Sequence, residues 1–562
     1  MKNALRQRPW LAFVLPLLFL YGCATAPETG PDYLTPGNAI PAARYDVSIR
    51  THDGLQLRAT VFQPALAPGQ DAPLVLHAHG FGVFRMSGPN SIYGLGVFSG
   101  KAALEAWRQG FWVISYDQRG HGDSEGMNRL MDPEGEVRDV SSVIDWSLAQ
   151  LKRISRDRAG DPRIGMIGES YGGGAMLLAG SQDERIDALI PVTTWHDFYA
   201  SLSPNQVPKS GWLTTLLLGD NLLNPGTVDP MINDAYWKAR DGILEPAMVD
   251  YLKVRSPATR CANGQISHAD TLLIQGFRDV AFPLNEAIAN RECLQRSGSD
   301  VRLIGTQGGH LLPFTQWSWV YPGYAVEDKV HCGAATLDLV TAAVDWFDEK
   351  LRDIPGKAAN IPPICLSQSY ERGIQVDQIQ KGGHPFRFGR TAIHSGFTGF
   401  FEVPLWPLER MAGLFLPRAH PQPVSVPQES TGTLRPAFTP VYVAKQAQEL
   451  VGIPLLDGQV ASSVDDPMLF AGVAVKRSRG RYYELLNDQV TPLRGNGRHQ
   501  VEMMAVSTHL EAGDVVGIWL FGYHNQYRFS HTGWFMDAAI EGTIALPLLN
   551  LAASTGPAPA VD

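Results

Sequence analysis

Residues 163–174, RIGMIGESYGGG, constrain the fold more than any other part of the sequence. They place a G-x-S-x-G pattern directly after an apolar, strand-like run and before a helical run that begins at Ala175. A serine in such a strand-to-helix turn projects from a tight bend, and the flanking Gly168 and Gly172 keep side chains away where two backbones crowd together. The pattern therefore predicts that Ser170 is a nucleophile. A turn with a purely structural role is the alternative.

Short apolar runs recur on both sides of this motif and alternate with helical stretches. The runs cover residues 74–77, 112–115, 164–167, 188–192, 271–275 and 301–304. A helical stretch among them carries apolar residues at positions 137, 140, 144, 148 and 151, which line one helix face. Repeated strand–helix alternation predicts an α/β domain with a mostly parallel sheet covered on both faces. An opening β-hairpin is expected before it, around the turn pair Asp53-Gly54.

A nucleophilic serine needs a histidine base and an acid that orients it, and in this type of fold they follow in the order Ser, Asp or Glu, His. Asp279 comes just after the predicted strand over residues 271–275, and His310 comes after the next strand. Both side chains are therefore expected at the carboxyl edge of the sheet, where Ser170 also lies. Asp270 is a rival acid, but it precedes its strand and is expected at the opposite end. A loop-capping Asp279 and an unremarkable His310 are the alternatives.

An acyl-transfer site also needs hydrogen-bond donors for the oxyanion. The run LVLHAHGFG over residues 74–82 is a strand that enters a glycine-rich turn. The backbone amides of Phe81 and Tyr171 are therefore the predicted donors. His77 and His79 face the same side of the strand and suggest a metal pair, but no third ligand is near in sequence, so we predict no metal site. We expect His79 to pack and hydrogen-bond beneath the turn instead.

Two further groups of residues lie near the predicted site. The run DQRGHGDS over residues 117–124 resembles a loop of α/β-hydrolases, and we expect Asp117 and Arg119 to hold it by charge-assisted hydrogen bonds. His121 as a second general base is the alternative. Four aromatic residues of the following segment form either a substrate pocket or a local core. They are Trp195, Tyr199, Trp212 and Trp237.

The first residues form a targeting signal. Lys2, Arg6 and Arg8 precede an apolar run over residues 10–20 that is too short to cross a bilayer as a helix. The run ends in LYGC, which resembles a bacterial lipobox, so residues 1–22 are predicted to be a lipoprotein signal peptide and Cys23 to be lipidated. Ala24 is typical of lipoproteins of the outer membrane, and we expect an exported protein anchored there. Ordinary cleavage after residues 24–26 (ATA), which releases a soluble secreted form, is the alternative.

Export changes how the remaining cysteines are interpreted, because pairing is favoured outside the cytoplasm. Cys261 precedes a predicted strand, and Cys293 lies near the end of the helix that returns from it, so both are expected at the same end of the sheet. This favours a Cys261–Cys293 disulfide and leaves Cys332 to pair with Cys365. Buried, unpaired thiols are the alternative.

The sequence divides into the following predicted segments: the signal peptide; a Pro-rich tether over residues 23–43; the α/β domain over residues 44–196 and 261–353, which ends in a helix over residues 334–351; a helical cap inserted over residues 197–260; a β-rich domain over residues 365–550; and a loose tail over residues 551–562. Strand-like runs separated by Gly, Asp and Asn dominate the β-rich domain, which favours a jelly-roll-like fold.

Taken together, these residues resemble the X-Pro dipeptidyl-peptidase and cocaine-esterase family of serine hydrolases. The resemblance is carried by the hairpin over residues 45–62, the loop over residues 117–126, the motif GESYGG at residues 168–173, residues 276–283 and His310. It implies an α/β-hydrolase fold, cleavage of esters or amides by Ser170, His310 and Asp279, and no cofactor. Family members with peptidase or cocaine-esterase activity carry a Pro-Tyr pair where this chain has His79-Gly80-Phe81-Gly82, so the resemblance favours a general hydrolase.

Charge and composition exclude other classes of protein. The chain has 47 Lys and Arg against 56 Asp and Glu, a net charge of −9, whereas nucleic-acid binders are usually basic. Its 44% hydrophobic content exceeds that of disordered chains. We therefore expect an enzyme with a small-molecule ester or peptide substrate, no nucleic-acid partner and a lipid-anchored attachment to the membrane. The alternative function is an envelope binding protein that keeps a hydrolase scaffold. The sequence makes no prediction of oligomeric state.

Overall fold

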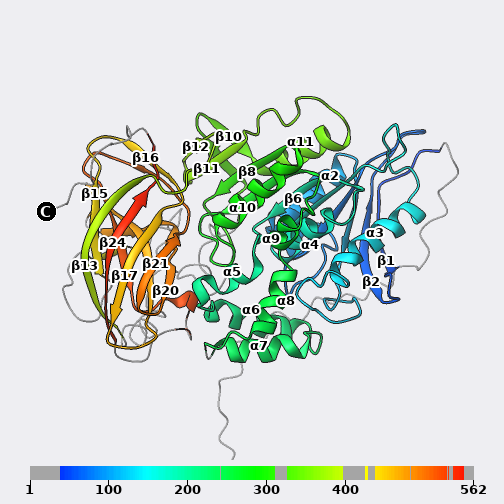
Figure 1. Ribbon diagram of the computed structural model, residues 1–562. Coiled ribbons are helices and arrows are strands. Elements are labelled where there is room, and N and C mark those ends of the chain that lie inside the picture. Colours follow the sequence, from blue (N-terminus) through cyan, green and yellow to red (C-terminus); the bar gives the residue numbers. More distant parts are fainter. Residues whose placement is uncertain are drawn as a thin grey trace, which may run out of the picture.

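The computed structural model describes residues 38–240, 242–310, 326–395, 425–427, 437–480, 482–527, 530 and 536–549. The predicted signal peptide, Cys23, most of the predicted tether and the predicted tail lie outside these residues. In the described part, a helix-covered sheet and an all-β unit lie side by side, and a group of helices contacts both (Figure 1).

The first unit is built on a ten-stranded sheet with the order β1-β2-β4-β3-β5-β6-β7-β8-β11-β12. Its strands are β1 (Ala43–Arg50), β2 (Gln56–Gln63), β3 (Leu74–Ala78), β4 (Trp112–Tyr116), β5 (Ile164–Glu169), β6 (Ile186–Val192), β7 (Asp270–Gly276), β8 (Val301–Thr306), β11 (Ile364–Ser369) and β12 (Arg372–Gln375). The pairing is parallel from β4 to β11, and β1 and β2 form the predicted antiparallel hairpin. The six predicted apolar strands are confirmed as β3 to β8.

Alternate side chains of the parallel strands enter two different cores. Leu74 and Leu76 belong to the core that includes α3 (Glu136–Gln150) and α4 (Tyr171–Gly180). Val75 belongs to the opposite core, which includes α2 (Phe98–Arg108) and α11 (Leu339–Leu351). Because both faces of the sheet are buried, its strands are continuous apolar runs instead of alternating ones. A further helix, α10 (Leu284–Leu294), packs on β7 and β8.

The segment predicted to be an inserted cap is helical and lies between β6 and β7. It contains α5 (Phe198–Leu202), α6 (Ser210–Leu223), α7 (Pro230–Arg240) and α8 (Pro246–Val254), and α9 (Pro257–Ala262) follows it. The Asp197 side chain caps α5 by accepting a hydrogen bond from the Ala200 amide. A proline begins each of α7, α8 and α9, where its missing N–H costs no helical hydrogen bond.

The end of the first unit differs from the prediction in two ways. The helix expected over residues 334–351 begins only at Leu339, because residues 335–338 form β10 (Ala335–Asp338), which pairs with β9 (Lys329–Cys332). Strand β11 then pairs with β8, and β12 pairs with β11. The boundary predicted at residue 365 is therefore wrong: residues 364–375 complete the large sheet by satisfying the backbone groups along the β8 edge.

The C-terminal unit is a sandwich of antiparallel sheets, as the β-type runs predict. One sheet holds β13 (His384–Ser395), β24 (Met536–Leu546), β17 (Leu455–Ser462) and β21 (Gly497–Glu502). A second holds β14 (Ser425–Pro427), β19 (Tyr482–Leu485), β18 (Met468–Lys476), β23 (Val515–Phe521), β15 (Ala437–Val443) and β20 (Thr491–Arg494). A small third sheet holds β22 (Val506–Leu510), β16 (Gln448–Gly452) and β25 (Leu548–Leu549). Leu456 and Ile544 of the first sheet share one core with Val473 and Ile518 of the second.

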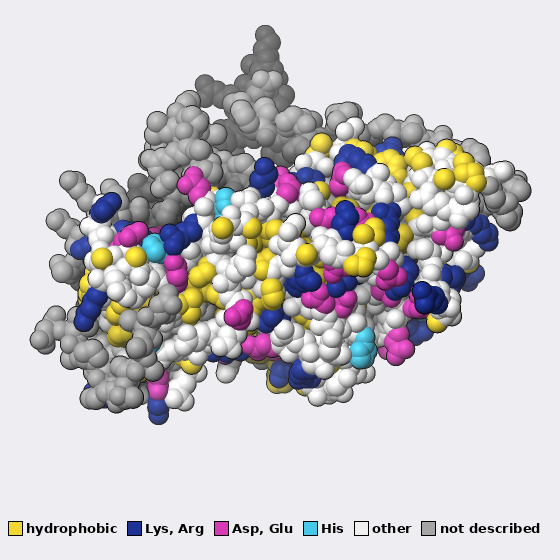
Figure 2. Space-filling view, turned by 90° about the horizontal axis from the view of Figure 1, so that it is seen from above, with side chains coloured by type: hydrophobic (Ala, Val, Ile, Leu, Met, Phe, Trp, Pro, Cys, Tyr) yellow, Lys and Arg dark blue, Asp and Glu magenta, His cyan; other side chains and the backbone are white. Residues whose placement is uncertain are grey.

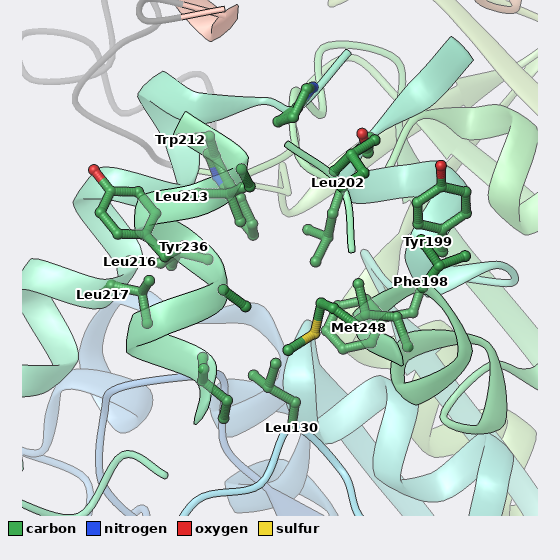
Figure 3. A pocket seen from close by; sticks show the side chains of 18 of the residues that line it. Leu130, Phe198, Tyr199, Leu202, Trp212, Leu213, Leu216, Leu217, Tyr236 and Met248 are labelled. Atoms are coloured by element: carbon green, nitrogen blue, oxygen red, sulfur yellow. The ribbon is translucent and has the colours of Figure 1, made fainter. Parts of the chain in front are cut away.

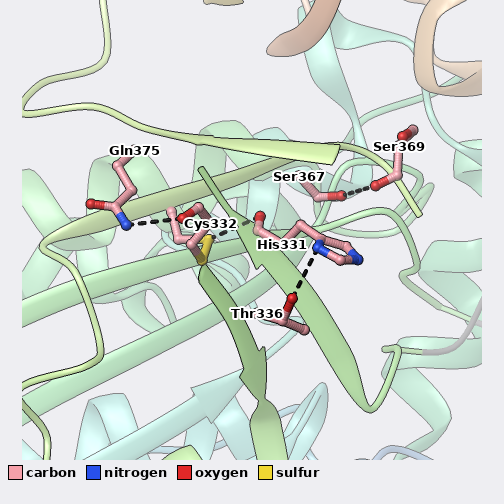
Figure 4. The surroundings of a disulfide bond; sticks show 7 residues. His331, Cys332, Thr336, Ser367, Ser369 and Gln375 are labelled. Carbon is pink, nitrogen blue, oxygen red and sulfur yellow. Dashed lines mark hydrogen bonds between the residues drawn. A yellow bond between two sulfur atoms is a disulfide. The ribbon is translucent and has the colours of Figure 1, made fainter. Parts of the chain in front are cut away.

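Two disulfides link neighbouring elements of the first unit. Cys261 on α9 is bonded to Cys293 on α10, with 6.1 Å between their Cα atoms. Cys332 on β9 is bonded to Cys365 on β11, with 5.3 Å between their Cα atoms, and ties the β9–β10 hairpin to the sheet (Figure 4). The side-chain Nε2 of Gln375 supports this hairpin by donating a hydrogen bond to the Cys332 carbonyl at 3.0 Å. These are the two pairings that the sequence favours.

Surface charges of both signs are interspersed. On the face seen in Figure 2, Lys and Arg side chains lie among Asp and Glu, with no broad area of positive charge in the described part. Among the described residues, no helix is both long and apolar enough to cross a membrane.

The close contact between α4 and β3 can be tested by substitution. A Cβ atom on Gly172 would lie 2.1 Å from the Ala78 carbonyl oxygen, which is backbone and cannot move aside. We expect Gly172→Ala to lower the free energy of unfolding by about 2–3 kcal/mol through overpacking. Gly219→Ala is the control, because Gly219 lies inside α6 and nothing lies within 4 Å of its added Cβ. This substitution should raise the free energy of unfolding by up to about 1 kcal/mol. Urea unfolding measures the stability of both variants. If Gly172→Ala were as stable as the unchanged protein, the close contact would be refuted.

Candidate active site

Ser170 occupies a strained turn between β5 and α4. Its φ of 57° and ψ of −111° lie outside the regions that non-glycine residues ordinarily adopt. The turn is held by two hydrogen bonds: the Ser170 amide donates to the Val192 carbonyl at 2.8 Å, and Thr194 Oγ1 donates to the Ser170 carbonyl at 2.9 Å. Added Cβ atoms on Gly168 and Gly172 would both press on the Ala78 carbonyl. The predicted strand–turn–helix geometry is therefore present at Ser170.

Asp279 lies in the loop after β7 and is completely buried. Its Oδ1 accepts hydrogen bonds from the amides of Ala281 and Phe282, both at 2.9 Å, and its Oδ2 accepts one from Gln275 Nε2 at 3.0 Å. These three donors satisfy the hydrogen-bonding needs of the buried carboxyl group. The rival Asp270 lies at the amino end of β7, where it pairs with Lys350, and is thus excluded from this edge by its position.

His310 is brought directly to Asp279. Its Nδ1 lies 2.7 Å from both carboxylate oxygens, so Nδ1 carries a proton and donates it to the carboxylate. In the neutral ring, Nε2 is then the free acceptor. The imidazole packs edge-on against Phe282 and Trp212, with ring centroids 5.3 Å and 6.2 Å away, which fixes its orientation.

Ser170 and His310 are not joined by a hydrogen bond in this structure: Nε2 has no partner among the described residues. Ser170 lies in the wall of a cavity, and so do Phe282 and Trp212, the two residues that hold the His310 ring. Hydrogen bonds of this kind are often long or absent without substrate. The structure thus joins the predicted acid to the predicted base, and it places the predicted nucleophile in a cavity wall that also contains Trp212 and Phe282, which pack against that base.

The turn after β3 is shaped by His79, as predicted. The Gln118 amide donates to His79 Nε2 at 2.9 Å, so Nδ1 carries the ring proton and donates it to the Gly80 carbonyl at 2.7 Å. Burial lowers the pKa of His79 well below its usual value, which keeps the ring neutral. Neither the Phe81 nor the Tyr171 amide donates to any described residue, and both residues line the cavity beside Ser170. His77 makes a separate hydrogen bond, between its Nδ1 and Ser115 Oγ, at 2.9 Å.

The loop over residues 117–124 is held by ion pairs, but Asp117 and Arg119 do not pair with each other. Asp117 is buried and accepts hydrogen bonds from Arg85. Arg119 reaches across to Asp53 in the hairpin turn and to Asp139 in α3, at 2.7 Å each. His121 is buried, and burial lowers its pKa. Its Nε2 lies 3.9 Å from Asp220 of α6, so His121 approaches the cap.

Three residues that the sequence did not single out hold the loop of Asp279. Gln275 Nε2 donates to the Phe282 carbonyl at 2.6 Å as well as to Asp279. Lys209, at the start of α6, is 1% exposed and donates to the Ala281 carbonyl at 2.9 Å. Gln489 of the C-terminal unit donates to the Asp279 carbonyl at 2.9 Å. No local pattern marks Lys209 and Gln489, because each acts through a contact with a distant part of the chain. Gln275 lies only four residues before Asp279, but the folded loop decides which groups its side chain reaches.

The cavity of about 110 Å³ continues from Ser170 into the cap (Figure 3). Three of the four aromatic residues considered from the sequence line it, namely Trp195, Tyr199 and Trp212. Trp237 does not: its side chain is 53% exposed and packs against Arg240 on the outside of α7. The aromatic residues thus form a pocket wall, except for the one that points to solvent.

Comparison with known families matches the part of the chain that holds this site. Residues 53–312 match the sequence model of the family described as X-Pro dipeptidyl-peptidase (S15 family). The matched segment begins in the β1–β2 turn and includes Ser170, Asp279 and His310.

Solved structures share the fold over nearly the whole chain. A CocE/NonD family hydrolase from Staphylococcus aureus is 14% identical, with a TM-score of 0.60 over 94% of this chain and 99% of that chain. An alpha-amino acid ester hydrolase is 13% identical, with a TM-score of 0.62 over 96% of this chain and 100% of that chain. The alignments therefore include the C-terminal β unit, and at these identities they establish a common α/β-hydrolase fold.

Curated proteins match shorter segments. Cutinase 2 of Thermobifida cellulosilytica is 29% identical over 144 residues, which cover 25% of this chain and 48% of the cutinase. The chain spans about half the length, or less, of the curated relatives that it matches. The similarity thus concerns one segment of each protein.

The burial of Lys209 beside the loop that holds Asp279 can be tested through the pH dependence of stability. Burial lowers its pKa to about 8, although the carboxylates of Asp279 and Glu286 oppose the shift. Above pH 8 the folded chain has released this proton, whereas the unfolded chain keeps it to about pH 10.4, so stability rises with pH in this window. Lys209 alone should add about 2 kcal/mol to the free energy of unfolding between about pH 7 and about pH 9.5.

Lys209→Met should lose this gain, as measured by urea unfolding at the two pH values. The exposed Lys445→Met is the control and should keep the pH dependence of the unchanged protein. An identical rise in stability for Lys209→Met and the unchanged protein would contradict the burial of the ammonium group.

Proposed function

We propose that this chain, a member of the X-Pro dipeptidyl-peptidase (S15) family, is a serine hydrolase that transfers an acyl group from an ester or amide to water. Ser170 is the nucleophile, His310 the general base and acid, and Asp279 the group that orients the histidine. The backbone amides of Phe81 and Tyr171 are the donors for the oxyanion. The family match and the cutinase similarity both support a hydrolase.

The observation that carries this proposal is the backbone of Ser170. A non-glycine residue with a φ of 57° costs free energy, and the surrounding contacts hold it there at the wall of a cavity. Such strain is expected where a side chain must be aimed at a reacting atom. The buried Asp279–His310 pair at the same edge of the sheet supports the assignment, because it supplies the proton acceptor that a serine hydroxyl needs.

The first half of the reaction forms an acyl-enzyme. Ser170 Oγ attacks the carbonyl carbon of the substrate while its proton passes to His310 Nε2, and the carbonyl oxygen becomes an oxyanion held by the two amides. Asp279 stabilises the resulting imidazolium. The bond to the leaving group then breaks, and His310 gives the proton to the departing alcohol or amine.

The second half releases the acid. A water molecule attacks the acyl-enzyme and gives its proton to His310, and a second tetrahedral oxyanion forms between the same amides. Its collapse returns the proton to Ser170 Oγ and frees the carboxylic acid. One ester and one water thus yield one acid and one alcohol, and the enzyme is restored.

We further propose that the protein is exported and anchored by a lipid on Cys23, at the outer membrane of an envelope that has one. The charged and apolar segment over residues 1–20 and the LYGC motif support export and lipidation. The two disulfides support an oxidising compartment, because both join cysteines of the described chain that would stay reduced in the cytoplasm.

Removal of the nucleophile tests the catalytic proposal. We expect Ser170→Ala to lower kcat on p-nitrophenyl acyl esters by about 10⁵-fold, because no other group can form the acyl-enzyme. Ser181→Ala, at the other end of the same helix, should keep kcat unchanged. Parallel assays with an X-Pro p-nitroanilide then separate esterase from dipeptidyl-peptidase activity. Full activity of Ser170→Ala, or no reaction of the unchanged protein with a fluorophosphonate, would favour an envelope binding protein instead.

Replacement of the lipidation residue tests the anchor. In cells that make the full chain, Cys23→Ser should move the protein from the detergent phase to the aqueous phase and abolish its labelling by an alkyne fatty acid. Thr25→Ala should leave both unchanged. A mature N-terminus at Pro27 without an acyl group, found by mass spectrometry, would instead establish cleavage after residue 26.

A further inference from the structure

The cavity beside Ser170 has an apolar wall contributed by the cap. Side chains of α6 and α7 face those of α5 and α8 across a common space (Figure 3). Its wall residues on these four helices include Leu202, Leu213, Leu216, Tyr236, Met248 and Leu252. A space of this kind excludes water and favours an apolar group of the substrate.

The two charged residues of this wall pair with each other, and Ser203 Oγ and Trp212 Nε1 are uncharged groups without a partner among the described residues. The Tyr236 hydroxyl is hydrogen-bonded to Thr214 Oγ1 at 2.6 Å. Lys238 and Glu245 form an ion pair at 3.0 Å at the exposed rim. Among the described wall residues, Glu245 is the only carboxylate, so none is left to neutralise a charged amino group inside the cavity. A substrate with a free α-amino group would therefore bury an unpaired charge there.

The position of His310 indicates which end of the substrate the cavity receives. His310 must protonate the leaving group, so the leaving group has to face its Nε2. The cavity wall contains Ser170, Phe81 and Tyr171, whereas the His310 ring packs behind Trp212 and Phe282 and is not part of the wall. The part of the substrate that enters the cap is thus the acyl group.

We propose that the substrates are esters of uncharged aliphatic acids longer than acetic acid, with the acyl chain buried in the cap cavity. This inference rests on the proposed serine hydrolase function and adds the substrate class. Each methylene group transferred from water into an apolar site raises kcat/KM by about fourfold while the cavity has room. The cap residues therefore set the preference for acyl length, and the residues at the carboxyl edge of the sheet carry out the chemical step.

A variant that fills the cavity tests the proposal. Ala235 lies in the cavity wall on α7, and Ala235→Phe should lower kcat/KM for p-nitrophenyl octanoate by about tenfold or more while acetate stays within about twofold. Leu218→Phe is the matched control, because Leu218 is on α6 of the same cap but is 66% exposed and outside the wall. It should leave the kcat/KM of both esters unchanged.

A second comparison needs no variant. The 4-methylpentanoyl and L-leucyl p-nitrophenyl esters have the same carbon skeleton and differ by the α-amino group. The unchanged protein should hydrolyse the amino-free ester with a kcat/KM at least about tenfold higher, because the ammonium group finds no free carboxylate in the described wall.

The outcomes separate this inference from the proposed function. Equal kcat/KM for acetate and octanoate, an equal loss of both in Ala235→Phe, or a preference for the leucyl ester would overturn the acyl-chain assignment, while hydrolysis that depends on Ser170 would still stand. Failure of the unchanged protein to hydrolyse any of these esters would instead overturn the proposed function.

Discussion

The close approach of α4 to β3 is the constraint on which the rest of the site depends. Gly168 and Gly172 lie against the Ala78 carbonyl, where no side chain fits, and this contact lets the chain turn sharply from β5 into α4. Ser170 is consequently held at a positive φ, and its side chain projects at the carboxyl edge of the sheet. The same approach brings the turn after β3, with the Phe81 amide, beside the first amide of α4. One packing contact thus sets the positions of the proposed nucleophile and of both proposed oxyanion donors.

The loop of Asp279 is a second centre, where three parts of the molecule meet. Gln275 belongs to the sheet, Lys209 to the cap and Gln489 to the C-terminal sandwich, and each donates a hydrogen bond to residues 279–282. An ion pair between Arg278 and Asp488 at 3.2 Å strengthens the link to the sandwich. The C-terminal unit therefore helps to fix the acid that orients His310. Because buried polar groups must be satisfied, these donors also explain how a fully buried carboxylate is tolerated.

Much of the fold was predictable because its signals are local. The apolar runs of β3 to β8 are buried on both faces, and the Asp53-Gly54 turn sits between alternating residues, so periodicity alone reveals these elements. The strands β10 and β11 were missed because their own residues show no clear strand pattern. Residues 335–338 continue into a helix without a break in composition, and residues 364–369 become part of the large sheet only because β8 offers an unpaired edge. A partner far along the chain therefore decided β11, whereas β10 pairs with β9, which directly precedes it.

The sequence by itself determined the strand–turn–helix motif at Ser170, the order in which Asp279 and His310 follow it, and the two cysteine pairings it favours. Each of these depends on spacing and on residue type within one or two neighbouring elements. Only the tertiary structure decided which aromatic residues of the cap line a cavity, that Trp237 points to solvent, and that Lys209 and Gln489 hold the loop of Asp279. The physical reason is that burial and hydrogen-bond partners are properties of the packed molecule. A side chain acquires them only when separate segments of the chain come into contact.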